Sequence, residues 1–477
     1  MQLAALPAQM AALVNARAAS GRIARDVHVQ SVASARPSAV LAHDASARSP
    51  SKMRLRIRAT AALPLLLLVR AAAAPLAAAP LPPLPALQVA GPLTVSGVSA
   101  GADFAAQFLV AFADSVSAAA VFAGQAPFCA TTRFANEAVV AGGCLSQPRG
   151  DLGPGCSGLP TTGAAPCVGC SPDGTTLQLD HCKRAPSQTA QPELLVALLA
   201  QAAALGQIAP SDHLNDGFHK LFAFRGMLDG VYLPGSVNTT VDTFVALGVN
   251  ARDTHFEASV NATHSMPSTD PALPRSSCAS FAPGYPGLEN CGFDGAGAMF
   301  DFFFADLVQP ANGTAAVPEN LVPFNQTLYE VGAFAGFATT GYIYVPKRCS
   351  AAGGRRPCAL HVAFHGCGQH ATYPGEGMAY TLHSGYAQWA DANDFAILMP
   401  QMGGFAEHNI TGGDVPRQLE AGCFDAFGQS GPAYAWRSGP QMAAVAKMIQ
   451  AVGGGRWWRE EAGRPSLPSA PHKWRSR

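Results

Sequence analysis

The stretch LTVSGVSAGADFAAQF, Leu93–Phe108, most constrains the fold, because an apolar run ends in a glycine-rich turn and a helix pattern follows at once. Its first five residues predict a buried strand. Residues 102–116 predict a helix with Phe104, Phe108 and Phe112 on one face. A second strand-like run, AAAVFAG, comes next. Strand, helix and strand in this order predict a parallel βαβ unit and therefore an α/β fold.

The alternation of strand and helix patterns continues along the chain. Helix patterns lie at 192–207, 297–307, 385–394 and 439–452, and strand patterns lie at 219–226, 341–346, 359–366 and 395–401. Without an internal repeat or a long internal linker, residues 87–453 are predicted to form one catalytic domain. An insertion is predicted at about 145–217. The Gly-, Pro- and Cys-rich region Cys129–Cys182 is expected to be a loop held by disulfides, and 454–477 to be a flexible tail.

Residues 1–86 have a composition typical of targeting sequence. They contain ten Lys or Arg but only two acidic residues. A basic start at Met53, an apolar run and an Ala-rich tract predict a signal peptide at about 53–79, followed by a Pro/Ala linker. The apolar run is too short to span a bilayer. Met53 is then the true start, or the first 52 residues are an organellar leader; both interpretations remain open.

Composition and cysteine usage agree with a secreted protein. The chain has 31 basic and 31 acidic residues, which gives no reason to expect a nucleic-acid partner. We expect a monomer without stable membrane insertion. Twelve cysteines and five Asn-x-Thr sequons fit a disulfide-bonded glycoprotein. The glycosylation candidates exclude Asn261, which lies too close to an important histidine; they are Asn238, Asn312, Asn325 and Asn409.

The turn between the first strand and helix carries a nucleophile motif. Gly97-Val98-Ser99-Ala100-Gly101 matches G-x-S-x-G, in which a serine is exposed on a tight strand-to-helix turn. A Gly/Ser-rich turn often has no chemistry, but this context favours Ser99 as a nucleophile. A serine hydroxyl needs a histidine base, and the histidine needs a carboxylate.

The acid and the base follow in the order Ser, acid, His. Asp229 comes just after the strand-like run HKLFAFRG, whereas Asp242 and Asp253 do not directly follow such a run. His264 lies in a polar loop after Asp229. His255 lies in a strand-like run and is predicted to be a surface or core residue. The remaining candidates precede the acid; they are His213 and His219.

The oxyanion hole requires two N–H donors, one from the residue after the nucleophile, Ala100. The second is expected from the loop His365-Gly366-Cys367-Gly368, which follows the strand ALHVAF. In the usual α/β-hydrolase order such a loop precedes the nucleophile. Its late position predicts a circular permutation, in which the last strands and the helix at 439–452 are the fold's first elements.

With these motifs the chain resembles the fungal-type extracellular poly(3-hydroxybutyrate) depolymerases, which are single-domain, circularly permuted α/β-hydrolases. The resemblance covers about Leu93 to Val452, excluding much of the insertion. It rests on motifs in the family's order: VSGVSAG, FRGMLDGVYLPG, ATHSMPSTD, NCGFDGAGA, TTGYIYVP, LHVAFHGCGQ, GYAQWADANDFAILMPQ and GPQMAAV. It implies a mostly parallel sheet with helices on both faces.

The resemblance also implies site residues and disulfides. The triad would be Ser99, Asp229 and His264, and the oxyanion hole would be the N–H groups of Ala100 and Cys367. Where the family carries a cleft-lining Trp, this chain has Phe424, which implies an apolar substrate-binding residue without an N–H donor. The implied disulfides are Cys367–Cys423, Cys278–Cys291 and Cys349–Cys358.

The remaining cysteines leave two interpretations open. Proximity predicts a Cys129–Cys144 bridge, although another cysteine in the insertion is an alternative partner for either. Four more cysteines include a C-x-x-C and suit either a zinc site or two disulfides, and the leader favours disulfides. These four are Cys156, Cys167, Cys170 and Cys182.

Together these features predict a secreted serine esterase that hydrolyses polyester or other hydroxyalkanoate esters through an acyl-enzyme. No metal or organic cofactor is required for that chemistry. The alternatives are a feruloyl or acetyl esterase acting on cell-wall polysaccharide and a catalytically silent polymer-binding relative. The complete candidate triad argues against the silent relative.

Overall fold

The predicted strand–helix–strand unit forms the centre of the fold. In a computed structural model, β1 (Val89–Val98) is followed by α2 (Ala100–Ala111) and by β2 (Val116–Phe122), which pairs with β1 in parallel. The residues that the structure describes are 80–129, 182–183, 192–276, 278–331, 335–354, 357–404, 421–426, 428, 430 and 433–454. The predicted signal peptide and the predicted tail beyond Gly454 lie outside them, whereas the end of the predicted Pro/Ala linker is described and its Leu84 is buried in the core.

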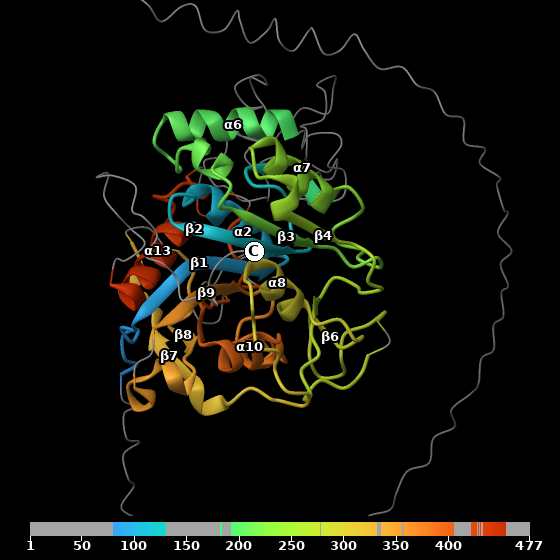
Figure 1. Cartoon of the computed structure of the whole chain (residues 1–477), viewed down its shortest axis with the longest axis vertical. Helices are drawn as coiled ribbons and strands as arrows, with labels where there is room; N and C mark the ends of the chain where they lie inside the picture. The colour runs from blue at the N-terminus through green and yellow to red at the C-terminus, as the bar shows by residue number, and fades with distance from the viewer. Residues whose placement is uncertain are drawn as a thin grey trace, which may run out of the picture. The chain divides into compact units, whose positions relative to one another are not determined.

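The described strands form an eight-stranded sheet in the order β4-β3-β2-β1-β9-β10-β8-β7 (Figure 1). β8 runs antiparallel to both neighbours, and the remaining pairs are parallel. The strands besides β1 and β2 are β3 (Lys220–Phe224), β4 (Thr254–Glu257), β7 (Leu321–Asn325), β8 (Thr340–Tyr344), β9 (Cys358–Phe364) and β10 (Phe395–Met399). A separate pair joins β5 (Met266–Pro267) to β6 (Leu288–Glu289).

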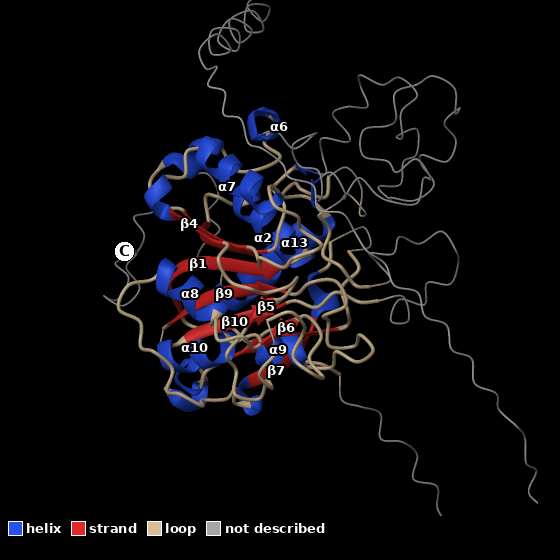
Figure 2. Cartoon of the chain, turned by 90° about the vertical axis from the view of Figure 1, so that its right-hand side faces the viewer, coloured by secondary structure: helices blue, strands red, loops and turns tan. Residues whose placement is uncertain are grey.

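Helices cover both faces of the sheet (Figure 2). Alternate residues of β2 divide between two cores, as the two-residue period of a strand requires. Ala119 and Val121 join the core beneath α2 and α13, whereas Ala120 and Phe122 join the core beneath α8 and α10. The helices besides α2 are α6 (Pro192–Ala204), α7 (Ser236–Ala246), α8 (Gly295–Phe303), α9 (Ala379–His383), α10 (Tyr386–Asn393) and α13 (Pro440–Gly453).

The sheet order shows the permutation. Numbered along the chain from β7 to β10 and then from β1 to β4, the strands lie in the order 1-2-4-3-5-6-7-8, which is that of an α/β-hydrolase. The helix α13 ends beside the start of β1, where the N–H of Leu87 donates to the carbonyl of Val452 at 2.9 Å. The two ends of the described fold therefore meet where an unpermuted chain would be continuous. Within the described part of the chain, no helix combines the length and apolarity needed to cross a membrane.

Two of the expected disulfides are present, Cys349–Cys358 and Cys367–Cys423. The predicted Cys129–Cys144 bridge is wrong, because Cys129 pairs with Cys182 across a Cα–Cα distance of 6.0 Å. The start of α7 holds Cys182 in place, because the Ser236 hydroxyl donates to the backbone carbonyl of Cys182 at 2.8 Å. This pairing also removes Cys182 from any zinc site. The other cysteines of the insertion lie outside the described residues; they are Cys144, Cys156, Cys167 and Cys170.

The predicted Cys278–Cys291 bridge is not formed, and both thiols are free. Cys278 has a left-handed backbone, with φ of 57°, and its thiol donates to the backbone carbonyl of Cys291 at 3.7 Å. The sulfur of Cys278 is therefore directed at the backbone of Cys291 rather than at its sulfur.

Candidate active site

The G-x-S-x-G stretch forms a strained turn between β1 and α2. Ser99 has φ of 56° and ψ of −127°, a conformation that few non-glycine residues adopt. A Cβ on Gly97 would lie 2.1 Å from the carbonyl oxygen of Gly101. A Cβ on Gly101 would lie 2.2 Å from the carbonyl oxygen of Phe364 at the end of β9. Both glycines are therefore needed for the approach of backbone to backbone that holds Ser99 at the helix N-terminus.

The structure brings the three predicted triad side chains together. His264 Nε2 lies 2.9 Å from Ser99 Oγ, and His264 Nδ1 lies 3.0 Å from Asp229 Oδ2. The three residues follow the carboxyl ends of β1, β3 and β4. Since these strands are parallel, their carboxyl ends lie at one edge of the sheet and the loops after them converge there. The arrangement allows His264 to take the Ser99 proton while Asp229 holds the ring.

Asp229 is held in its ionised form by its hydrogen bonds. Its Oδ1 accepts from the N–H groups of Val231 and Tyr232 at 2.8 and 2.9 Å. Burial alone would raise the pKa of Asp229, but the bond and charge of His264 and these two N–H donors lower the pKa below its ordinary value. The group is therefore suited to orient His264 rather than to accept its proton.

The competing acids and histidines have other partners. Asp253 pairs with Arg252, and Asp242 is exposed on α7. His219 is bonded to Asp216 and to the carbonyl of Ala113. The remaining candidate bases lie outside the hydrogen-bond chain from Ser99 to Asp229: His255 is exposed on β4 and stacks on Phe222, and His213 lies in a short 3₁₀ helix.

The predicted oxyanion loop lies beside Ser99. A Cβ on Gly366 would lie 3.1 Å from the Cβ of Ser99, and Gln369 Oε1 accepts from the N–H of Gly366 at 2.7 Å. The disulfide to Cys423 ties down the next residue, Cys367. Ala100 is the first residue of α2, where N–H groups have no intrahelical acceptor. The geometry thus places both the candidate donor loop and the helix N-terminus next to Ser99.

Phe424 does not line a cleft. Its side chain is 0% exposed. Its ring packs against those of Phe104, Phe364 and His365, with centroids 5.0 to 5.1 Å apart. The prediction that Phe424 contacts substrate is wrong for this structure, because α2 and the end of β9 cover the ring completely.

Three buried polar residues at the site were not predicted. Asp103 follows Ser99 by four residues, one helical turn, and Tyr232 follows Asp229 by three. Glu289 lies on β6, and its carboxylate accepts from the N–H of Thr263 at 3.0 Å and from the Thr263 hydroxyl. The helical spacing was an available signal for Asp103. Nothing in the sequence pattern links Glu289 to Thr263, the residue before His264, because the pairing of β5 with β6 brings the two segments together.

Glu289→Ala tests whether the Glu289 carboxylate stabilises the loop that carries Thr263 and His264. We expect the free energy of unfolding to fall by about 2 kcal/mol, because the half-buried N–H and hydroxyl of Thr263 both lose their acceptor. Urea titration followed by circular dichroism measures the change. The control is Glu319→Ala, which removes an exposed carboxylate and should change the free energy by less than about 0.5 kcal/mol. Equal effects of the two substitutions would contradict the proposed support.

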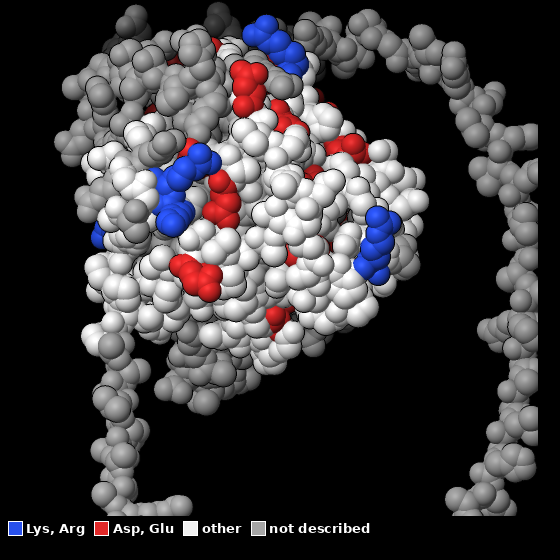
Figure 3. Space-filling model, turned by 60° about the horizontal axis from the view of Figure 1, so that its bottom comes forward, with Lys and Arg blue, Asp and Glu red and all other residues white. Residues whose placement is uncertain are grey.

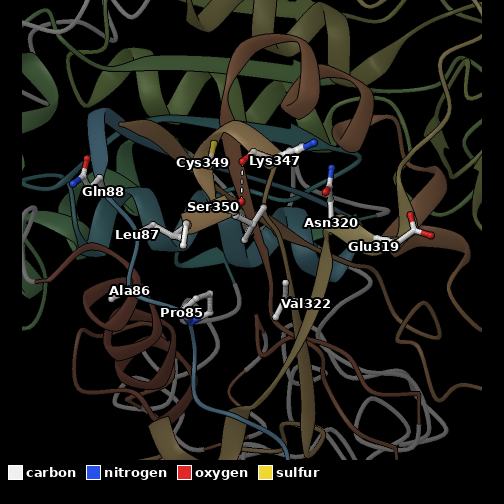
Figure 4. A pocket seen from close by; sticks show the side chains of 12 residues that line it. Pro85, Ala86, Leu87, Gln88, Glu319, Asn320, Val322, Lys347, Cys349 and Ser350 are labelled. Atoms are coloured by element: carbon white, nitrogen blue, oxygen red, sulfur yellow. Dashed lines mark hydrogen bonds between the residues drawn. The ribbon is translucent and has the colours of Figure 1, made fainter. Parts of the chain in front are cut away.

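A cavity of about 640 Å³ lies at the other end of the sheet (Figure 4). It is lined by Leu87 and Gln88, which precede β1, and by Lys347 and Ser350, which precede β9. The triad instead follows the carboxyl ends of the strands. The cavity therefore does not belong to the candidate active site.

Comparison with known proteins gives a consistent result. The chain is 30% identical over 375 residues to a poly(3-hydroxybutyrate) depolymerase of Delftia acidovorans, covering 78% of this chain and 62% of the relative. It is 33% identical over 229 residues to a polyhydroxybutyrate depolymerase of Talaromyces funiculosus, covering 46% of this chain and 64% of the relative. The chain thus spans less than two thirds of the length of either relative. No protein-family model matches it.

Solved structures extend the similarity to the fold. The crystal structure of the PHB depolymerase from Penicillium funiculosum matches with a TM-score of 0.57 at 26% identity, over 78% of this chain and 99% of that one. A serine-to-alanine PHB depolymerase complexed with an R3HB trimer matches with the same score at 25% identity and the same coverage. In sequence and in fold, the chain is similar to PHB depolymerases of the fungal type.

Proposed function

We propose that the chain is a serine esterase that hydrolyses polyesters of 3-hydroxyalkanoates. The observation that supports this most directly is the hydrogen-bond chain from Ser99 through His264 to Asp229, 2.9 and 3.0 Å long at its two steps. The names of the relatives support the substrate class.

The reaction follows from the geometry. His264 takes the proton of Ser99 as the Ser99 oxygen attacks the ester carbonyl, and the N–H groups of Ala100 and Cys367 stabilise the resulting oxyanion. His264 then protonates the leaving alcohol. Water, deprotonated by His264, attacks the acyl-Ser99 ester, and the acid product leaves as Ser99 recovers its proton. Asp229 stays ionised throughout and orients the ring.

One face of the molecule carries few charged side chains (Figure 3). On the face shown in Figure 3, the described Lys, Arg, Asp and Glu side chains are scattered across a largely uncharged surface. A polyester carries no charge along its backbone, so its binding relies on apolar contact. This face gives no electrostatic reason for a polyanionic partner.

We also propose that the chain is a secreted glycoprotein. Its signal-like segment at about 53–79 and its described disulfides support secretion. Asn238 and Asn312 are exposed in the structure and are the best glycan acceptors, whereas Asn325 is half-buried and caps a short helix. Asn409 lies outside the described residues.

A polymer assay tests the proposal. The purified protein should clear a suspension of amorphous poly(3-hydroxybutyrate) and release soluble hydroxybutyrate oligomers, and the Ser99→Ala variant should release none. Feruloylated and acetylated polysaccharides are tested in parallel. Release of ferulate or acetate without polymer clearing would reassign the substrate, and polymer clearing by the variant would contradict the mechanism.

A further inference from the structure

Tyr232 contacts two members of the candidate triad directly. Its N–H donates to Asp229 Oδ1 at 2.9 Å. Its ring stacks on the imidazole of His264, with centroids 5.2 Å apart and planes 10° apart. The residue is fully buried, so these contacts fix its position from several directions.

Asp103 fixes the hydroxyl of Tyr232. The hydroxyl donates to Asp103 Oδ2 at 2.7 Å, and the N–H of Gln125 donates to Asp103 Oδ1 at 2.7 Å. Asp103 lies in the first turn of α2, four residues after Ser99, and is 2% exposed. A carboxylate in the first turn is favoured by the helix dipole, yet burial without an ion pair is costly. The fold retains this buried carboxyl group directly behind the nucleophile.

A second tyrosine–carboxylate pair, Tyr344 and Asp391, has a structural role. Tyr344 on β8 donates to Asp391 on α10 at 2.6 Å. This pair has the same chemistry, but it joins β8 to α10 at a distance from the triad strands in the sheet order. It therefore serves as a control for the loss of a tyrosine–carboxylate bond, with a buried tyrosine and a half-buried carboxylate.

We propose that Tyr232 and Asp103 are positioning residues of the triad: Tyr232 holds the His264 ring by its face, and the Asp103 carboxylate orients the Tyr232 hydroxyl beside Ser99 and supplies negative charge near the imidazolium. This inference rests on the proposed function. The charge would lower the energy of the step in which His264 carries a proton, since opposite charges attract strongly at a buried site.

The ionisation of Asp103 gives the pair a pH signature. Burial raises the pKa of Asp103 to about 6, against the lowering effects of Lys183, of the bonds from Tyr232 and Gln125, and of His264. The other charged groups nearby are Asp229 and Arg225, which bonds to the carbonyl of Tyr232. As the pH falls through about 6, Asp103 takes up a proton and the negative charge is lost.

The test compares Tyr232→Phe and Asp103→Asn with the controls Tyr344→Phe and Asp391→Asn. Tyr232→Phe keeps the stacked ring and removes the hydroxyl. Asp103→Asn keeps the size and removes the charge. Two readouts are measured from pH 5 to 9: kcat and KM for a soluble p-nitrophenyl ester, and the rate at which diisopropyl fluorophosphate labels Ser99, followed by mass spectrometry. Labelling reports nucleophile reactivity without depending on any ester substrate.

We expect kcat and the labelling rate to fall about tenfold in both site variants, with KM changed less than about twofold. Asp103→Asn should lose the step near pH 6 that belongs to Asp103 and keep every other step of the wild-type profile. The controls should keep wild-type values and the wild-type profile. Circular dichroism checks the fold of each variant; should Tyr232→Phe fail to fold, the pH profile of Asp103→Asn decides.

The two proposals fail in different ways. Wild-type protein that neither hydrolyses esters nor labels at Ser99 would overturn the proposed function and this inference with it. Wild-type protein that labels but does not clear polymer would overturn only the substrate, and the labelling rates would still test the pair. Site variants that match their controls in rate and pH profile would overturn the positioning role alone.

Discussion

Ser99→Ala is expected to lower kcat for ester hydrolysis about a million-fold while leaving the fold unchanged. The substitution removes only Oγ, the atom 2.9 Å from His264 Nε2. Alanine and serine have similar backbone preferences at the left-handed φ of 56° that this position requires. The remaining oxyanion donors would still stabilise attack by water, so a small residual rate is expected. Kinetics with a soluble p-nitrophenyl ester measure kcat, and circular dichroism reports the fold.

A double variant sharpens this prediction. Ser99 and His264 act as one unit, so Ser99→Ala combined with His264→Ala should lose no more activity than either variant alone. Ser259→Ala removes an exposed hydroxyl bonded to Glu257 and serves as the control, with activity expected within about twofold of wild type. Additive losses, or a Ser99→Ala variant within about tenfold of wild type, would contradict a triad in which Ser99 is the nucleophile.

The α/β architecture was predictable because its signals are local. An apolar run, a turn with glycines at both ends and an amphipathic helix specify the βαβ unit around Ser99 without reference to the rest of the chain. The permutation was predictable for a related reason, since the loop after 359–364 carries the oxyanion motif and parallel strands bring such loops to one edge. The helix Ser236–Ala246 was not predicted because its sequence is polar, and the strand Leu321–Asn325 was not predicted because it is only five residues long and contains a proline.

The predictions that were wrong concern residues whose position depends on contacts between distant segments of the chain. Cys144 is nearer to Cys129 in sequence than Cys182 is, but the start of α7 holds Cys182 against Cys129. Phe424 occupies the position of a cleft-lining residue by resemblance, but the rings of Phe104 and Phe364 enclose it. Such outcomes follow from packing, which no local pattern records.

In the candidate site, too, some residues could be predicted from local patterns and others depend on long-range contacts. Ser99, Asp229 and His264 could be chosen by order and by position after strands. Tyr232 and Asp103 could not be chosen in that way, since their importance lies in a hydrogen bond across 129 residues of sequence. A buried polar residue one helical turn after a nucleophile is nevertheless a useful candidate for a positioning role in similar chains.

Gly101→Ala is expected to destabilise the fold by about 4 kcal/mol or more, because the new methyl group would lie 2.2 Å from the carbonyl oxygen of Phe364 and 2.5 Å from that of His365. Both contacts are to backbone, which cannot move aside as a side chain would. The end of β9 would have to shift, and the loop carrying Cys367 would shift with it. Urea titration measures the stability of the variant, and the soluble fraction after expression reports complete failure to fold.

The control for Gly101→Ala is Gly230→Ala, whose added methyl group meets no atom within 4 Å and whose backbone is not left-handed. Its stability should stay within about 1 kcal/mol of wild type. A Gly101→Ala variant that folds with wild-type stability would show that β9 and α2 do not pack as closely as this structure has them. A variant that folds but has lost activity would instead separate the two roles of Gly101, since the oxyanion loop would have moved while the sheet stayed intact. The glycine therefore links the two halves of the permuted fold: the close approach that it allows places the predicted oxyanion loop beside Ser99.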